Sequence, residues 1–150
     1  MIRLPTADGL ALIQRWEGFR HSPYQDSVGV WTIGYGTTVY PDGRRVGPQD
    51  PMVGEELASA YLLDHVARLA CPSVLRLITV PLSDGQYDAL VSFVYNLGGG
   101  ALQASQLRQC VIRREDEKAA EQFGRWIWAG GRKLKGLVAR RRAEAIMYLS

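Results

Sequence analysis

A helical pattern that begins near Gly54 and continues to the C-terminus limits the possible folds of this chain more than any other feature. Apolar residues recur there at helical spacing, with a clear break at the three glycines of residues 98–100. Strand-like alternation is confined to Val30–Tyr35, between a turn at Val28-Gly29 and a second turn at Pro41-Asp42-Gly43. The pattern therefore predicts an α+β protein with one small antiparallel sheet and many helices.

The expected elements follow from caps and turn residues. A third short strand is predicted to begin or end at Val46, and a loop rich in proline and glycine at residues 47–53. The predicted helices are residues 7–17 with Thr6 as the cap, 55–70 or onward through a bend at Pro72 to Leu77, a helix starting at residues 82–84 and ending before Gly98, and then 105–113, 116–128 and 136–149.

Length and composition indicate a single globular domain. At 150 residues, with 47% hydrophobic and 22% charged residues, the chain is large enough for one core. We expect one domain over residues 1–150, with a sheet-bearing lobe at about 14–54, a connecting helix at about 55–78 and a helical lobe at about 79–150. The N-terminal helix would bridge the two lobes, and a cleft between them could hold a polymer.

Neither a membrane segment nor a metal site is predicted. No run approaches the ~18 apolar residues of a membrane span, and the N-terminus lacks the apolar core of a signal peptide. We therefore expect a protein that stays in the cytoplasm where it is made and does not insert stably into a membrane. Cys71 and Cys110 lack metal-ligand spacing and are predicted to be free, buried thiols.

Residues 16–38, WEGFRHSPYQDSVGVWTIGYGTT, contain the candidate catalytic groups Glu17, Asp26 and Thr32. Two carboxyls and a hydroxyl that orients water are what hydrolysis of a glycosidic bond requires. One carboxyl must be protonated to donate to the leaving oxygen, and the other must be ionised. Alone, each residue has an ordinary structural explanation: a surface charge, a turn residue and a strand residue.

The surroundings of the two carboxyls differ in a way that suits separate roles. Leu10, Ile13 and Glu17 follow one helix stripe, and Gly18 suits the position after the helix end. Partial burial there favours the neutral form of Glu17. Asp26 lies in a polar stretch before a turn, so we expect it to be solvated and ionised.

Three collinear blocks resemble the phage-type lysozymes, the endolysins of tailed phages. Trp16-Glu17-Gly18, Asp26 and Thr32-Ile33-Gly34-Tyr35-Gly36 match the catalytic segment of that family at the same spacing. Residues 86–98 resemble its central helix, and residues 123–145 resemble its closing helices.

The resemblance implies a lysozyme-like fold and hydrolysis of the β-1,4 bond between N-acetylmuramic acid and N-acetylglucosamine in peptidoglycan. It implies Glu17 as general acid, Asp26 as its ionised partner, Thr32 as a water-positioning group, inversion at the sugar carbon, and no cofactor or metal. Tyr95 and Gln106 match positions near the sugar cleft. A monomer is expected, with a separate membrane-permeabilising protein giving access to the wall. The chain departs from the family pattern at Cys110 and Ala139.

Basic residues are concentrated near the C-terminus. Arg125 to Arg142 contains seven basic residues and no acidic one, although the formal net charge is only +3. Such a run is usually a solvated helix face, but it can also attract an anionic polymer such as peptidoglycan. Nucleic-acid binding is not expected, because none of the common modules is visible.

Arg141 is predicted to point inward, because it falls on the apolar stripe of the last helix. A buried guanidinium needs a carboxylate partner, and the candidates are the neighbourhood of Glu17, Asp64 or Asp88. Arg140 and Arg142 fall off the stripe and are predicted to be solvated.

Three alternative functions remain open from the sequence. A lytic transglycosylase cuts the same bond with one acid and forms an anhydro sugar. A non-catalytic module would bind the cell wall with an inactive triad. A basic helical protein would bind nucleic acid with a steep salt dependence.

Overall fold

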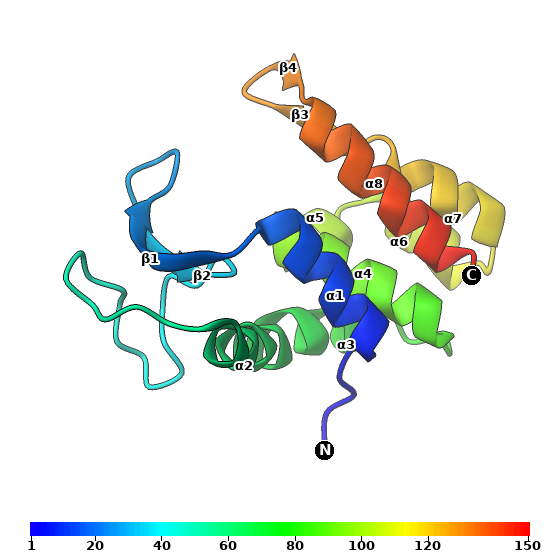
Figure 1. Cartoon of the computed structure of the whole chain (residues 1–150). Helices are drawn as coiled ribbons and strands as arrows, with labels where there is room; N and C mark the ends of the chain where they lie inside the picture. The colour runs from blue at the N-terminus through cyan, green and yellow to red at the C-terminus, as the bar shows by residue number, and fades with distance from the viewer.

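The computed structural model describes residues 1–150 and confirms an α+β fold. Strands β1 and β2 lie at one end of the molecule, most helices at the other, and α1 runs between them (Figure 1). The elements are α1 (Ala7–Glu17), β1 (Arg20–Gln25), β2 (Trp31–Gly34), α2 (Glu55–His65), the π-helical segment η1 (Val66–Ala70), α3 (Cys71–Leu77), α4 (Asp84–Leu97), α5 (Gly99–Gln103), α6 (Gln106–Ile112), α7 (Asp116–Phe123), β3 (Trp128–Ala129), β4 (Arg132–Lys133) and α8 (Lys135–Tyr148).

Helix α1 begins and ends where the sequence predicted. The hydroxyl of Thr6 accepts the N–H of Gly9 at 3.2 Å, which caps the first turn. The backbone N–H of Thr6 also binds Oδ1 of Asp88 at 2.9 Å, and its hydroxyl donates to the other oxygen of that carboxylate. Gly18 follows the helix with φ of 71°, a conformation that suits glycine. Asp88 therefore ties the start of α1 to α4.

The predicted hairpin forms, but the predicted third strand does not. Strands β1 and β2 are antiparallel, with Tyr24 opposite Thr32. Near Val46 there is only an isolated bridge between Val39 and Arg45. The N–H of Gly47 donates to the Asp50 side chain at 2.8 Å, so the chain leaves the ladder there and enters the loop.

The connecting helix takes the longer of the two predicted forms and runs from Glu55 to Leu77. Its irregularity is the π turn of η1 rather than a bend at Pro72. Pro72 lies in the first turn of α3 and has no N–H to offer an earlier carbonyl. The π turn lies just before this proline: the N–H of Cys71 donates to the carbonyl of Val66, five residues earlier, instead of four as in an α-helix. Both cysteines are free and buried, as predicted.

Helix α4 is the centre of the core. Ser83 caps it, and the side chain of Gln86 returns a hydrogen bond to the Ser83 N–H in a capping box. Residues 87–94 are all buried, and α4 packs against α1, α3 and α8. Polar groups on this helix, such as Ser92, must therefore find partners inside the protein.

The segment after α7 differs from the prediction. The helix expected to continue to residue 128 ends at Phe123, and a short hairpin of β3 and β4 follows. Gly130 and Gly131 form its turn with φ of 58° and 76°. The short helix α5 was also not predicted. No helix of this structure has the length and apolar character to cross a membrane.

Candidate functional site

Glu17, at the last position of α1, is held by Arg140 of α8. Nη1 of Arg140 lies 2.8 Å from Oε2 of Glu17, and only 21% of the Glu17 side chain is exposed. The second nitrogen of the guanidinium, Nη2, binds the carbonyl and the hydroxyl of Ser92, each at 3.3 Å. A nearly buried arginine thus fixes the orientation of the Glu17 carboxyl group, and it does so through a hydrogen bond to Oε2.

The other oxygen of Glu17 faces the turn after β2. A Cβ added to Gly36 would lie 2.7 Å from Oε1 of Glu17 and 3.5 Å from the hydroxyl of Tyr95. Gly36 has φ of 80°, so both its backbone conformation and this close approach require glycine. The Tyr95 hydroxyl donates to the Tyr35 carbonyl at 3.3 Å. Helix α4 and the hairpin therefore meet beside the carboxyl.

Asp26 and Thr32 converge on a single carbonyl, that of Val30. This oxygen accepts the N–H of Asp26 and the hydroxyl of Thr32, both at 2.9 Å. Oδ1 of Asp26 accepts the N–H groups of Val28 and Val30, also at 2.9 Å each. Continuing the register of β1 and β2 makes Asp26 and Thr32 diagonal neighbours on one face, which places their Cα atoms about 7–8 Å apart.

Tyr95 and Gln106 differ in their relation to Glu17. Burial raises the pKa of the Tyr95 hydroxyl, and the nearby Glu17 raises it further, so the group remains a neutral donor. Gln106 is exposed at the start of α6, where it lines a cavity of about 290 Å³ with Arg125 and Trp126. The structure brings Tyr95 to the candidate acid and leaves Gln106 in a separate cavity.

Arg141 is buried as predicted, but its predicted partners are wrong. It is only 1% exposed, and its Nε lies 2.7 Å from Oε1 of Glu144. Its Nη2 donates to Oδ1 of Asn96 at 2.8 Å. The two other candidate partners are used elsewhere: Asp64 pairs with Arg68, and Asp88 binds Thr6.

The prediction that Arg140 is solvated is also wrong, whereas Arg142 is exposed as predicted. Arg140 is 4% exposed and lies beside the Arg141 face of α8. A residue next to an apolar stripe can turn a long side chain inward when a partner waits there. Glu17 and Glu144 are those partners, at 2.8 and 3.4 Å.

Glu144 joins the two arginines into one buried network, and sequence reasoning missed it. Its Oε2 accepts the Ser92 hydroxyl at 2.6 Å and Nη2 of Arg141 at 3.2 Å. Burial raises the pKa of Glu144, although both guanidiniums and the Ser92 hydroxyl act in the opposite direction. Burial also lowers the pKa of Arg141, but an arginine starts so high that its charge remains. The network therefore joins two guanidiniums to the carboxyl groups of Glu144 and Glu17.

A pairwise signal for this network was present in the sequence. Glu144 follows Arg140 by four residues and Arg141 by three, which are the spacings of helical ion pairs. The apolar period of a single helix does not report such pairs. The Glu17 contact has no comparable signal, because 123 residues separate it from Arg140. No group of three or more His, Cys, Asp or Glu side chains is arranged to hold a metal ion.

Comparison with known proteins gives a consistent set of matches. The family profile described as "Phage lysozyme" matches residues 14–144. The endolysin of Bacillus phage B103 is 38% identical over 144 residues, which are 95% of this chain and 52% of that protein. The chain thus spans about half the length of that relative. A SAR-endolysin of Bacteriophage PS119 is 36% identical over 85% of this chain and 73% of its own length.

The match to Salmonella phage P22 covers both chains almost fully. Its endolysin is 33% identical over 97% of each chain. A crystal structure of a P22 lysozyme mutant superposes with a TM-score of 0.89, covering 99% of this chain and 100% of the other at 31% identity. Sequence and fold therefore agree over the whole chain.

Proposed function

Because this chain belongs to the phage lysozyme family, we propose that it is an endolysin that cuts peptidoglycan with Glu17, Asp26 and Thr32. The bond is the β-1,4 linkage between N-acetylmuramic acid and N-acetylglucosamine. The observation that carries the assignment of roles is the placement of Glu17. It is half-buried between Arg140 and the Gly36 turn, next to a hairpin that carries a second, partly exposed carboxyl group, that of Asp26.

Glu17 acts as the general acid through Oε1, the oxygen that Arg140 leaves free. When the proton passes to the leaving sugar oxygen, Glu17 becomes negatively charged. Nη1 of Arg140, at 2.8 Å from Oε2, stabilises the charge as it develops. An interaction that strengthens during the reaction lowers the barrier, whereas one of constant strength does not. Arg140 is therefore a positioning residue that also favours release of the proton.

Thr32 and Asp26 hold the attacking water. The only proton of the Thr32 hydroxyl is donated to the Val30 carbonyl, so its lone pairs can accept a hydrogen bond from water. Asp26 keeps Oδ2 free after Oδ1 has accepted two backbone N–H groups. A water that donates to both side chains has its own lone pair directed away from them. The proposal includes inversion at the sugar carbon, which requires the two carboxyls to be about 6.5–9.5 Å apart.

Thr32→Val tests the role in holding water. Valine keeps the shape of the 3%-exposed side chain and has high strand propensity, but it cannot accept from water. We expect the rate of wall lysis to fall about tenfold or more, with little loss of thermal stability. Lysis rate and melting temperature, measured on the same preparation, distinguish a role in holding water from a role in packing. Unchanged lysis with unchanged or raised stability would show that Thr32 only packs.

Gly36→Ala tests the close approach of the turn to Glu17, with Gly43→Ala as the matched control. Both glycines have positive φ, 80° and 89°, so alanine costs about 1–2 kcal/mol of stability at either position. Only at Gly36 would the new Cβ meet Glu17, because nothing lies within 4 Å of the Gly43 position. We expect Gly36→Ala to lower the lysis rate about 100-fold, since small displacements of a catalytic group have effects of that size. Equal lysis rates for the two variants would show that the close approach of the Gly36 turn to Glu17 has no role in catalysis.

The remaining expectations stay predictions. They are a monomer, the lobe boundaries, contact of Gln106 with substrate, and cytoplasmic synthesis followed by release through a separate membrane-permeabilising protein. Product analysis of digested peptidoglycan tests the central proposal against a lytic transglycosylase and a non-catalytic module.

A further inference from the structure

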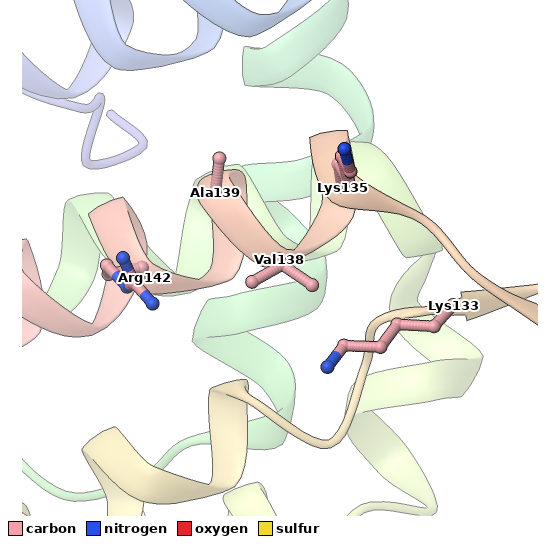
Figure 2. A pocket seen from close by; sticks show the side chains of 5 residues that line it. All are labelled: Lys133, Lys135, Val138, Ala139 and Arg142. Carbon is pink, nitrogen blue, oxygen red and sulfur yellow. The ribbon is translucent and has the colours of Figure 1, made fainter.

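A cavity of about 540 Å³ lies at the start of α8, away from Glu17. Its lining contains three cationic side chains, Lys133, Lys135 and Arg142, together with Val138 and Ala139. Lys133 extends from β4 back beneath the first turns of α8, toward Val138, while Arg142 lies one turn further along the helix (Figure 2). The hairpin and the helix thus build one cationic pocket from two elements.

None of the three cations of this pocket is engaged by an acid. All three are exposed, and none forms an ion pair or a side-chain hydrogen bond. An adjoining cavity of about 290 Å³, which shares Lys133 and Arg142 with this pocket, has one acidic lining residue, Glu121. Three positive charges therefore outnumber one negative charge at this place.

The N-terminus of α8 adds to the positive potential. No side chain caps the helix, whose N-cap residue is Leu134. The first N–H groups of an uncapped helix carry partial positive charge and bind anions readily. Lys135 is the first helical residue, so its ammonium and these N–H groups occur together.

We propose that this pocket binds the carboxylates of the peptide stems that peptidoglycan carries. This inference rests on the proposed function, because the stems reach the protein only if the glycan strand is its substrate. Planar carboxylates suit a guanidinium and ammonium groups. The pocket would hold the polymer while Glu17 acts on the sugar, so it contributes to affinity and not to the chemical step.

The reach of a stem peptide limits which stem can fill this pocket. Val138 and Arg140 are about 200° apart around α8 and about 3 Å apart along its axis, so the pocket lies on the side opposite the Glu17 contact. The helix is about 10–12 Å across with its side chains. Half the circumference of such a cylinder is about 16–19 Å, whereas an extended peptide of four residues spans about 13–14 Å, so the stem in the pocket belongs to a part of the wall other than the sugar at Glu17.

The test compares two triple variants with equal loss of charge. The pocket variant is Lys133→Gln/Lys135→Gln/Arg142→Gln, and the control is Arg45→Gln/Arg76→Gln/Arg113→Gln, three exposed arginines without ion pairs outside the pocket. Each takes the formal net charge from +3 to 0, since 18 basic residues become 15 against 15 acidic ones. Dissociation constants and backbone amide shifts are measured by NMR with three probes: a synthetic stem tetrapeptide, the same peptide with its carboxylates amidated, and a glycerol-phosphate oligomer.

We expect the carboxylated peptide to shift amides around Lys133 to Arg142 in the wild-type and control proteins. The pocket variant should bind the carboxylated peptide about tenfold more weakly than the wild type does. The wild type should bind the amidated peptide about tenfold more weakly than the carboxylated one. The effects are of this modest size because each exposed charge contributes only part of a kcal/mol. Glu121→Gln should tighten binding. Equal affinity for the two peptides, equal weakening in both triple variants, or tighter binding of the phosphate oligomer would overturn the proposal. Hydrolysis of peptidoglycan by the wild type is measured separately, so a protein that cuts but fails this test refutes only the pocket.

Discussion

Replacing Glu17 by glutamine is expected to lower the rate of peptidoglycan hydrolysis about 10²-fold to 10⁴-fold while the protein still folds. Glutamine has the same shape and keeps an oxygen that can accept from Nη1 of Arg140, now 2.8 Å from Oε2. It has no proton of suitable acidity for the leaving sugar oxygen, and loss of a general acid has effects of this size. The measurement is the initial rate of clearing of purified cell walls, with a urea titration of the same sample.

The control is Glu56→Gln, which removes an exposed carboxyl in the first turn of α2. It should change the rate by less than about twofold, because an exposed surface charge contributes little. A Glu17→Gln protein that is folded and clears walls at a rate near that of the wild type would remove Glu17 from the mechanism. Retained wall binding by the inactive variant separates loss of chemistry from loss of affinity.

Arg140→Ala is expected to have a large effect on stability, a loss of about 3–5 kcal/mol in the free energy of unfolding. Removing this buried guanidinium leaves buried polar groups without a partner, and such a loss costs about this much. Here Glu17 loses its guanidinium, and Ser92 loses a donor to its carbonyl. Arg142→Ala, two residues along the same helix, should change stability by no more than about 0.5 kcal/mol, because that side chain is exposed.

Arg140→Lys should fall between these two variants. Lysine keeps the charge, but a single ammonium cannot reproduce the fork that reaches Glu17, Ser92 and Glu144 together. Denaturant titration of all three variants gives the comparison. Equal, small losses for Arg140→Ala and Arg142→Ala would contradict the buried network and favour a charged surface. Arg140→Lys should also slow hydrolysis, since Glu17 would lose part of its positioning.

The parts of the fold that follow from local chemistry were predictable from the sequence. Thr6 and Gly18 mark the ends of α1, and Ser83 with Gln86 marks the start of α4, because caps act within a few residues. The hairpin of β3 and β4 was missed because its strands contain two exposed residues each. Its turn signal, Gly130-Gly131, was present but lacked flanking apolar strands.

The candidate site was predictable in part for a similar reason. Glu17, Asp26 and Thr32 lie within one short segment, where spacing and turn residues carry information. The partner of Glu17 comes from α8, and its identity depends on how α8 packs on α4. Periodicity favoured Arg141 as the inward arginine, yet Arg140 also turns inward because two carboxylates meet it. Which arginine of α8 points inward therefore depends on tertiary contacts between segments that are distant in the sequence.

The most direct test of the proposed chemistry is mass analysis of purified peptidoglycan digested in water labelled with heavy oxygen. Hydrolysis between N-acetylmuramic acid and N-acetylglucosamine predicts N-acetylmuramic acid at the new reducing ends, with one labelled oxygen for each bond cut. The Glu17→Gln variant should release almost none of these products. New ends made of anhydromuramic acid without label would contradict the account and identify a transglycosylase, and intact walls after binding would identify a non-catalytic module.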